Sequence, residues 1–236
     1  MSTYVFIPGA GGDPWQFHLV IRDLEAMGQA AIGVTLPSGD DGAGWSEYAD
    51  AVVEAIGDRR DLVLVAQSLA GFSAPIVCER VPVDLLVLLN AMIPLPGETG
   101  NDWWGDTGSG AAQQEYLASI GLTDDEARDD RTIYFHDVPK EIVDEAFSRG
   151  EPQQSMTPMS QRFPLAAWPD VATRVIAGRD DRLFPLEFQR RVARERLAIE
   201  ADEIPGGHML ALSHPDELVE QFEAYRRTLA SPAPKS

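Results

Sequence analysis

The stretch "VLVAQSLAGFSAP", residues 63–75, places one serine, Ser68, between an apolar run and a segment of helical type. It approximates G-x-S-x-G, the turn that exposes a catalytic serine between a strand and a helix. Two alanines, Ala66 and Ala70, stand where that motif has glycines. Each adds only a methyl group, and Gly71 adds freedom at the next position. The stretch therefore predicts a strand, a tight turn at the serine and a helix.

Apolar, β-rich runs alternate with amphipathic segments on both sides of this turn. We expect strands at 3–9, 30–36, 61–67, 83–91, 172–178 and near 198–204, and helices at 14–27, 45–58, 71–81, 185–197 and 215–229. Strands that are apolar on both faces and alternate with helices indicate a parallel sheet covered on both sides. The predicted fold is α/β, with a mostly parallel six-stranded sheet and helices on both faces.

The alternation stops between the fourth and fifth predicted strands, at residues 95–165, where Gly, Pro and Asp cluster. We predict that this stretch is a cap or lid inserted into a core made of residues 1–94 and 166–236. Aromatic and methionine side chains suit an apolar, adjustable pocket, although most of them would form the cap's own small core. The candidate substrate contacts from the cap are Trp103, Trp104, Tyr134 and His136.

Composition and charge limit the classes of partner. With 19 Lys and Arg against 38 Asp and Glu, the formal net charge is −19, which disfavours nucleic acid and anionic membranes as partners. The most apolar stretch, residues 83–95, is too short to span a bilayer and contains Asn90. The single cysteine, Cys78, excludes an intrachain disulfide and is expected to pack in the core. Without a recognisable leader sequence, the expected location is cytoplasmic.

A serine hydroxyl is a poor nucleophile unless a base lies beside it, and the base needs a carboxylate to hold its tautomer. The stretch "VIAGRDDRLFP" follows the fifth predicted strand and supplies Asp180 and Asp181. The stretch "EIPGGHMLALSHPDE" follows the sixth and supplies His208. The order Ser, Asp, His along the chain is the one that this sheet topology uses. The spacing therefore predicts a triad of Ser68, one of the two aspartates and His208.

The chain resembles the α/β-hydrolase superfamily, and within it the small hydroxynitrile lyase and plant esterase-like group with its bacterial relatives. The stretches that carry the resemblance are "YVFIPGAGG", "AQSLAG", "GRDDRLFPLEFQ" and "PGGHMLALSHPDE". It implies that Asp181 is the triad acid and that the backbone N–H groups of Leu69 and Ala10 form the oxyanion hole, with Gly11 less favoured than Ala10. The family usually has His-Gly in the first loop, where this chain has Pro8-Gly9.

The resemblance also implies a function: a serine hydrolase that cleaves a small, largely apolar carboxylic ester through an acyl-enzyme, with no metal or organic cofactor. A thioesterase, a carbon–carbon bond hydrolase or lyase, and a receptor-like binding protein of the same fold stay open, as does the oligomeric state. Cyanohydrin cleavage is disfavoured because Met209 and Gly9 stand where family lyases carry lysine and threonine. A dinucleotide site is disfavoured because Pro14 takes the third glycine position of that motif.

Overall fold

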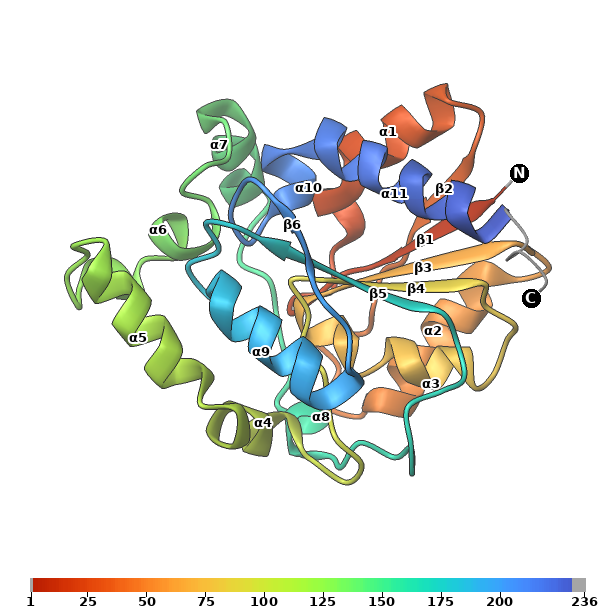
Figure 1. Ribbon diagram of the computed structural model, residues 1–236, viewed down its shortest axis with the longest axis horizontal. Helices are drawn as coiled ribbons and strands as arrows, with labels where there is room; N and C mark the ends of the chain where they lie inside the picture. The colour runs from red at the N-terminus through yellow and green to blue at the C-terminus, as the bar shows by residue number, and fades with distance from the viewer. Residues whose placement is uncertain (1, 231–236) are drawn as a thin grey trace, which may run out of the picture.

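The computed structural model describes residues 2–230, and a single six-stranded sheet runs through it (Figure 1). The strands are β1 (Thr3–Ile7), β2 (Ala30–Gly33), β3 (Leu62–Gln67), β4 (Leu85–Leu89), β5 (Thr173–Gly178) and β6 (Asp202–Ile204). Their order in the sheet is β2-β1-β3-β4-β5-β6, and every neighbouring pair is parallel. The predicted α/β fold is confirmed, and the sheet is wholly rather than mostly parallel.

Helices cover both faces of the sheet (Figure 1). One face carries α1 (His18–Ala26), α10 (Leu210–Ser213) and α11 (Pro215–Ala230), and the other carries α2 (Trp45–Ile56), α3 (Ala74–Cys78) and α9 (Leu186–Leu197). Alternate residues of β1 separate the two cores: Tyr4 and Phe6 pack with Phe222 of α11, while Val5 and Ile7 belong to the core under α2. Because both side-chain rows of the strand are buried, its sequence is apolar or aromatic after Thr3.

Several predicted boundaries move for local reasons. Asp13 caps the first helical segment as expected, accepting a hydrogen bond from Trp15 N at 2.9 Å, but this segment starts as a 3-10 turn, η1 (Pro14–Phe17). The strand expected near 198–204 keeps only its last three residues, because Ala198 ends α9 in the left-handed region with φ +55°. The hydrophobic pattern thus predicts which elements exist, but the backbone conformation of single residues decides where they begin and end.

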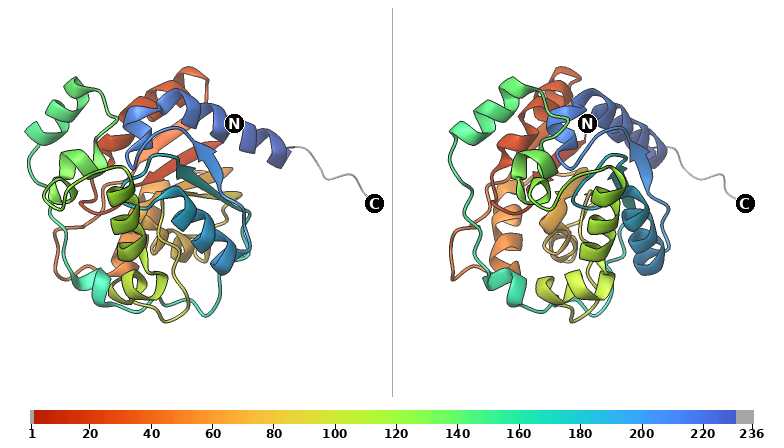
Figure 2. Two further views of the ribbon diagram at one scale, coloured as in Figure 1. Left: turned by 60° about the vertical axis from the view of Figure 1, so that its left-hand side comes forward. Right: turned by 90° about the vertical axis from the view of Figure 1, so that its left-hand side faces the viewer.

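The segment between β4 and β5 is mainly helical. It contains α4 (Gly100–Thr107), α5 (Ser109–Ser119), η3 (Glu126–Arg128), α6 (Asp130–Tyr134), α7 (Lys140–Ser148) and α8 (Thr157–Ser160). These helices lie beside the end of the sheet toward which the strand arrows point (Figures 1 and 2). A buried ion pair links the start of this segment to α9: Nη2 of Arg196, on α9, lies 2.8 Å from Oε1 of Glu98. Within residues 2–230, no helix is both long and apolar enough to cross a bilayer.

Candidate active site

Ser68 lies in the turn after β3 with φ +54°, a left-handed backbone conformation that residues other than glycine rarely adopt. Its carbonyl oxygen accepts a hydrogen bond from Met92 N at 3.0 Å, which ties the turn to the chain leaving β4. A Cβ atom on Gly71 would lie 1.7 Å from Met92 O, and one on Gly9 would lie 2.9 Å from Ser68 Cβ. Neighbouring segments therefore approach the turn most closely at Gly71 and Gly9. This explains why alanine is accommodated at Ala66 and Ala70, where the motif has glycines.

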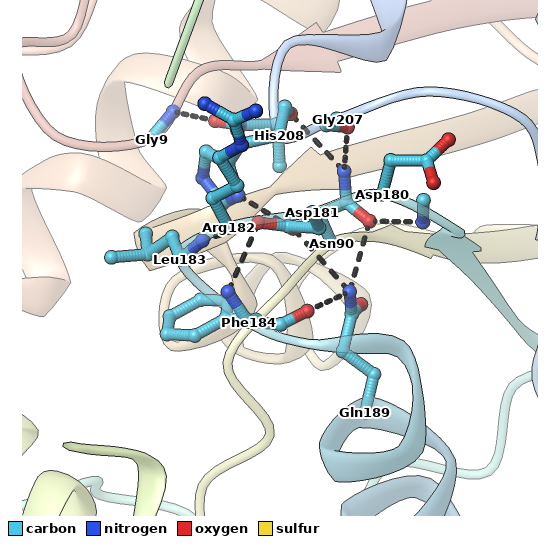
Figure 3. Close-up of polar contacts among 12 residues, drawn as sticks. Gly9, Asn90, Asp180, Asp181, Arg182, Leu183, Phe184, Gln189, Gly207 and His208 are labelled. Carbon is cyan, nitrogen blue, oxygen red and sulfur yellow. Dashed lines mark hydrogen bonds and ion pairs between the residues drawn. The ribbon is translucent and has the colours of Figure 1, made fainter. Parts of the chain in front are cut away.

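The first of the predicted partners lies in the loop after β5, where Asp181 is fully buried. Its Oδ1 accepts hydrogen bonds from Leu183 N at 2.8 Å and from Phe184 N at 3.0 Å (Figure 3). Its Oδ2 lies 2.8 Å from His208 Nδ1. Because an ionised carboxylate only accepts, Nδ1 carries the proton, and Nε2 of the imidazole keeps its lone pair.

Asn90, at the end of β4, is a site residue that the sequence analysis did not select. It is fully buried, with φ +45°. Its Nδ2 donates to the carbonyl oxygens of Gly207 and His208, both at 3.1 Å, and its Oδ1 accepts from Gly178 N at 2.7 Å (Figure 3). The one sequence signal was a polar amide closing an otherwise apolar strand. Asn90 thus joins the ends of β4 and β5 to the loop that carries the histidine.

Gln189, on α9, is a second buried amide that the sequence analysis missed. Its Nε2 donates to Phe184 O at 2.6 Å and lies 3.2 Å from Asn90 Oδ1 and 3.3 Å from Asp181 Oδ2 (Figure 3). The Gln189 amide therefore contacts Asp181, the loop that carries it, and Asn90. This network holds the carboxylate in place with neutral donors.

The loop after β1 is fixed by two side-chain amides. Gly9 N donates to Gln67 Oε1 at 3.2 Å, and Gly11 N donates to Gln154 Oε1 at 3.1 Å. These bonds hold a loop that lacks the histidine usual in the resembling family. Because the Gly11 N–H is already occupied, it is not free to meet a substrate oxygen.

Ala10 and Leu69, the two residues expected to form the oxyanion hole, both line the cavity described below. Within residues 2–230, neither backbone N–H has a protein acceptor. Leu69 lies in the first turn of η2 (Ser68–Gly71), where helix geometry leaves N–H groups unpaired. Both donors are therefore available to an oxygen in the cavity.

A cavity of about 980 Å³ adjoins this turn, and both Ser68 and His208 line it. Within residues 2–230, the imidazole's hydrogen bond is the one to Asp181, and the serine shares the cavity without a hydrogen bond to the ring. Aromatic edges flank the imidazole, with the rings of Tyr134 and Phe184 centred 5.6 and 5.5 Å from it. The apolar side chains in the wall include Met92, Trp104, Phe147, Met156, Met159 and Leu183.

Of the four candidate contacts from the segment between β4 and β5, Trp104 and Tyr134 line the cavity, but Trp103 and His136 do not. The Trp103 side chain is fully buried beside Phe184, and its Nε1 donates to Ile93 O at 3.1 Å. It packs in the main core, where its ring also contacts that of Phe188 on α9. His136 instead points to the loop after β5.

The charges along the cavity wall are mostly negative. Among the described residues that line it, Arg149 is the one cation, and it donates to Asp13 Oδ2 at 3.0 Å while lying over the Trp15 ring. Asp130 and Glu151 add two further carboxylates. The wall therefore offers no unpaired cation to an anionic ligand. Residues 2–230 also contain no group of three or more His, Cys, Asp or Glu side chains that could hold a metal ion.

The fold and the site define an α/β protein with a cavity at the carboxyl edge of a parallel sheet, where folds of this type place their ligands. A model described as the alpha/beta hydrolase family matches residues 4–221, so the chain belongs to that family. The resemblance to the α/β-hydrolase superfamily seen in the sequence is thereby confirmed. No curated protein sequence matches the chain.

Solved structures share the fold over nearly the whole chain. A polyneuridine aldehyde esterase is 18% identical, with 96% of this chain and 99% of that chain covered and a TM-score of 0.76. A pyrethroid hydrolase from Sphingobium faniae JZ-2 is 21% identical, with 99% of each chain covered and a TM-score of 0.73. A methylesterase from Arabidopsis is 17% identical, with 97% and 100% covered and a TM-score of 0.72.

Proposed function

We propose that the chain is a serine hydrolase that cleaves a neutral, largely apolar carboxylic ester with a triad of Ser68, His208 and Asp181. The observation that carries the proposal is the 2.8 Å contact between His208 Nδ1 and Asp181 Oδ2, in the wall of a cavity that Ser68 also lines. It leaves Nε2 of the imidazole able to accept a proton. Membership of the alpha/beta hydrolase family supports this chemistry.

In this mechanism, His208 Nε2 takes the proton of Ser68 Oγ as that oxygen bonds to the ester carbonyl carbon. The N–H groups of Leu69 and Ala10 hold the oxygen that becomes negative. The carbon–oxygen bond to the alcohol then breaks, and His208 returns the proton to the departing alkoxide. Water, activated by the same imidazole, releases the carboxylic acid. The hydrogen bond from Ser68 to the imidazole, which this step needs, forms when substrate binds, since catalytic hydrogen bonds are often long in the free enzyme.

The shape and charge of the cavity support a substrate class. A volume of about 980 Å³ admits an ester of drug size, which is larger than the small ester expected from the sequence. Aromatic and methionine side chains in the wall favour apolar groups, and we propose Trp104 and Tyr134 as contacts from a cap formed by residues 95–165. The acidic wall disfavours substrates that carry a free carboxylate or phosphate.

The similar structures give independent support. Two of them are named as esterases and a third as a pyrethroid hydrolase. Thioesters and activated carbon–carbon bonds would use the same triad, so both belong in the substrate panel. A receptor-like binding protein would keep the cavity but would not turn over an ester.

The decisive experiment compares wild type with Ser68→Ala on p-nitrophenyl esters and on a fluorophosphonate probe. Ser68→Ala is expected to lose hydrolysis by several orders of magnitude and all labelling while remaining folded. Ser73→Ala is the matched control, because Ser73 donates to Ala70 O at 3.3 Å in the same turn and does not line the cavity. Undiminished hydrolysis by Ser68→Ala would refute the triad. Wild type that neither labels nor hydrolyses any member of the panel would favour the binding protein.

A further inference from the structure

Two residues that follow α6, His136 and Asp137, contact both loops that carry the acid and the base. We name these the acid loop, residues 179–185, and the histidine loop, residues 205–209. The two loops already touch each other: Asp180 N donates to Gly206 O at 2.9 Å. Any element that contacts both loops therefore affects how the acid and the base meet.

Asp137 holds the residue immediately before the base. Its Oδ2 accepts a hydrogen bond from Gly207 N at 2.6 Å. On the other side, the Gly207 carbonyl oxygen accepts from Asn90 Nδ2 at 3.1 Å. Both main-chain groups of Gly207, the residue before His208, are thus bound. Its N–H binds Asp137, from the segment between β4 and β5, and its carbonyl oxygen binds Asn90, which follows β4.

His136 holds the residue immediately before the acid. Its Nε2 lies 3.0 Å from Asp180 O, and because a carbonyl oxygen only accepts, Nε2 carries the proton. A Cβ atom on Gly207 would lie 2.6 Å from His136 Nε2 and 2.8 Å from Asp137 Oδ1. Glycine is therefore required at that position for this contact to form.

Two histidines lie beside the Asp137 carboxylate. His136 Nε2 lies 4.0 Å from its Oδ1, and His214 Nδ1, at the end of α10, lies 3.6 Å from its Oδ2. The Asp180 carboxylate, on the acid loop, instead accepts a hydrogen bond from Gly206 N with its Oδ2 at 3.3 Å. Within residues 2–230, the buried Asp137 Oδ1 has no hydrogen-bond partner, so the carboxylate's one strong contact is with the histidine loop.

We propose that His136 and Asp137 are positioning residues that set the geometry of the Asp181–His208 pair from outside the substrate cavity. Neither side chain lines the cavity, so each acts on turnover through the loops and not through substrate binding. A small displacement of a catalytic group is enough to lower the rate strongly. The assignment rests on the function proposed above, in which this pair serves Ser68.

The experiment measures kcat and KM for a p-nitrophenyl ester in wild type, Asp137→Ala and Asp137→Asn. Asp137→Ala is expected to lower kcat about tenfold or more with KM within about twofold. Asp137→Asn keeps an oxygen that accepts from Gly207 N–H, so it should retain most of kcat. Asp144→Ala is the control, because Asp144 forms an exposed ion pair with Lys140 on α7 and contacts neither loop.

A second readout does not need turnover: the proton NMR signal of His208 Nδ1–H, recorded without substrate. Asp137→Ala should shift or broaden it, and Asp137→Asn should keep it near the wild-type position. If Asp137→Ala does not fold, His136→Ala is measured in its place with the same expectation. Unchanged kcat and an unchanged signal would overturn the proposal, as would an Asp137→Asn defect equal to that of Asp137→Ala. Loss of the Ser68 mechanism would appear separately, as hydrolysis that survives Ser68→Ala.

Discussion

Replacing Asn90 with alanine tests whether the buried amide network stabilises the fold around the site. The side chain is fully buried and satisfies three main-chain groups: Gly178 N–H and the carbonyl oxygens of Gly207 and His208. Each buried group left without a partner costs about 1–3 kcal/mol. Alanine at φ +45° adds about 1 kcal/mol, because asparagine tolerates the left-handed region better. The free energy of unfolding should therefore fall by at least about 4 kcal/mol, the sum of the lower limits.

The assay is urea unfolding followed by circular dichroism, with thermal melting as a second measurement. For a chain of this size, a loss of about 4 kcal/mol corresponds to a fall in Tm of roughly 8–16 °C. Asn101→Ala is the matched control, since that exposed asparagine makes one weak contact, 3.4 Å from its Nδ2 to Ser160 Oγ. Its unfolding free energy should change by less than about 0.5 kcal/mol. A loss of under about 1 kcal/mol in Asn90→Ala would refute the reasoning.

Three further predictions concern close packing and burial elsewhere in the protein. Gly71→Ala should destabilise the protein by about 3 kcal/mol in urea unfolding, because the new methyl group meets main-chain atoms, whereas Gly105→Ala meets nothing within 4 Å and should not destabilise it. Glu98→Ala should cost about 3–5 kcal/mol in the same measurement, since it leaves the buried Arg196 guanidinium without its carboxylate; a cost below about 1 kcal/mol would contradict this. Burial raises the pKa of the Cys78 thiol to about 12, so at pH 8 the folded protein holds almost no thiolate. Alkylation of the folded protein by iodoacetamide should therefore be at least about 100-fold slower than alkylation of the protein unfolded in urea. Equal rates in the two states would contradict this effect of burial.

Most of the fold could be predicted from the sequence because its signals are local. The run predicted at 61–67 is β3 (Leu62–Gln67), and the helix predicted at 185–197 is α9 (Leu186–Leu197). Strand ends were less predictable where one residue turns the chain, as Ala198 does before β6. Periodicity reports which faces are buried and carries little information about single dihedral angles.

The residues of the candidate site could likewise be predicted only in part from the sequence. The sequence placed Ser68, Asp181 and His208 after the third, fifth and sixth strands, and the structure brings the last two within 2.8 Å, across 27 residues of chain. It could not show that Asn90 reaches Gly207, 117 residues later, because neither residue has a local pattern that names its partner.

The sequence alone determined the six strands, most helices that cover the sheet, its parallel order and the order of the candidate reactive side chains, because alternating burial and turn chemistry act over a few residues. Only the tertiary structure decided the required glycines, the amide network and the contact of Asp137 with Gly207. These depend on the distance between segments that are far apart in the chain, and that distance exists only once the whole sheet and its helices have packed.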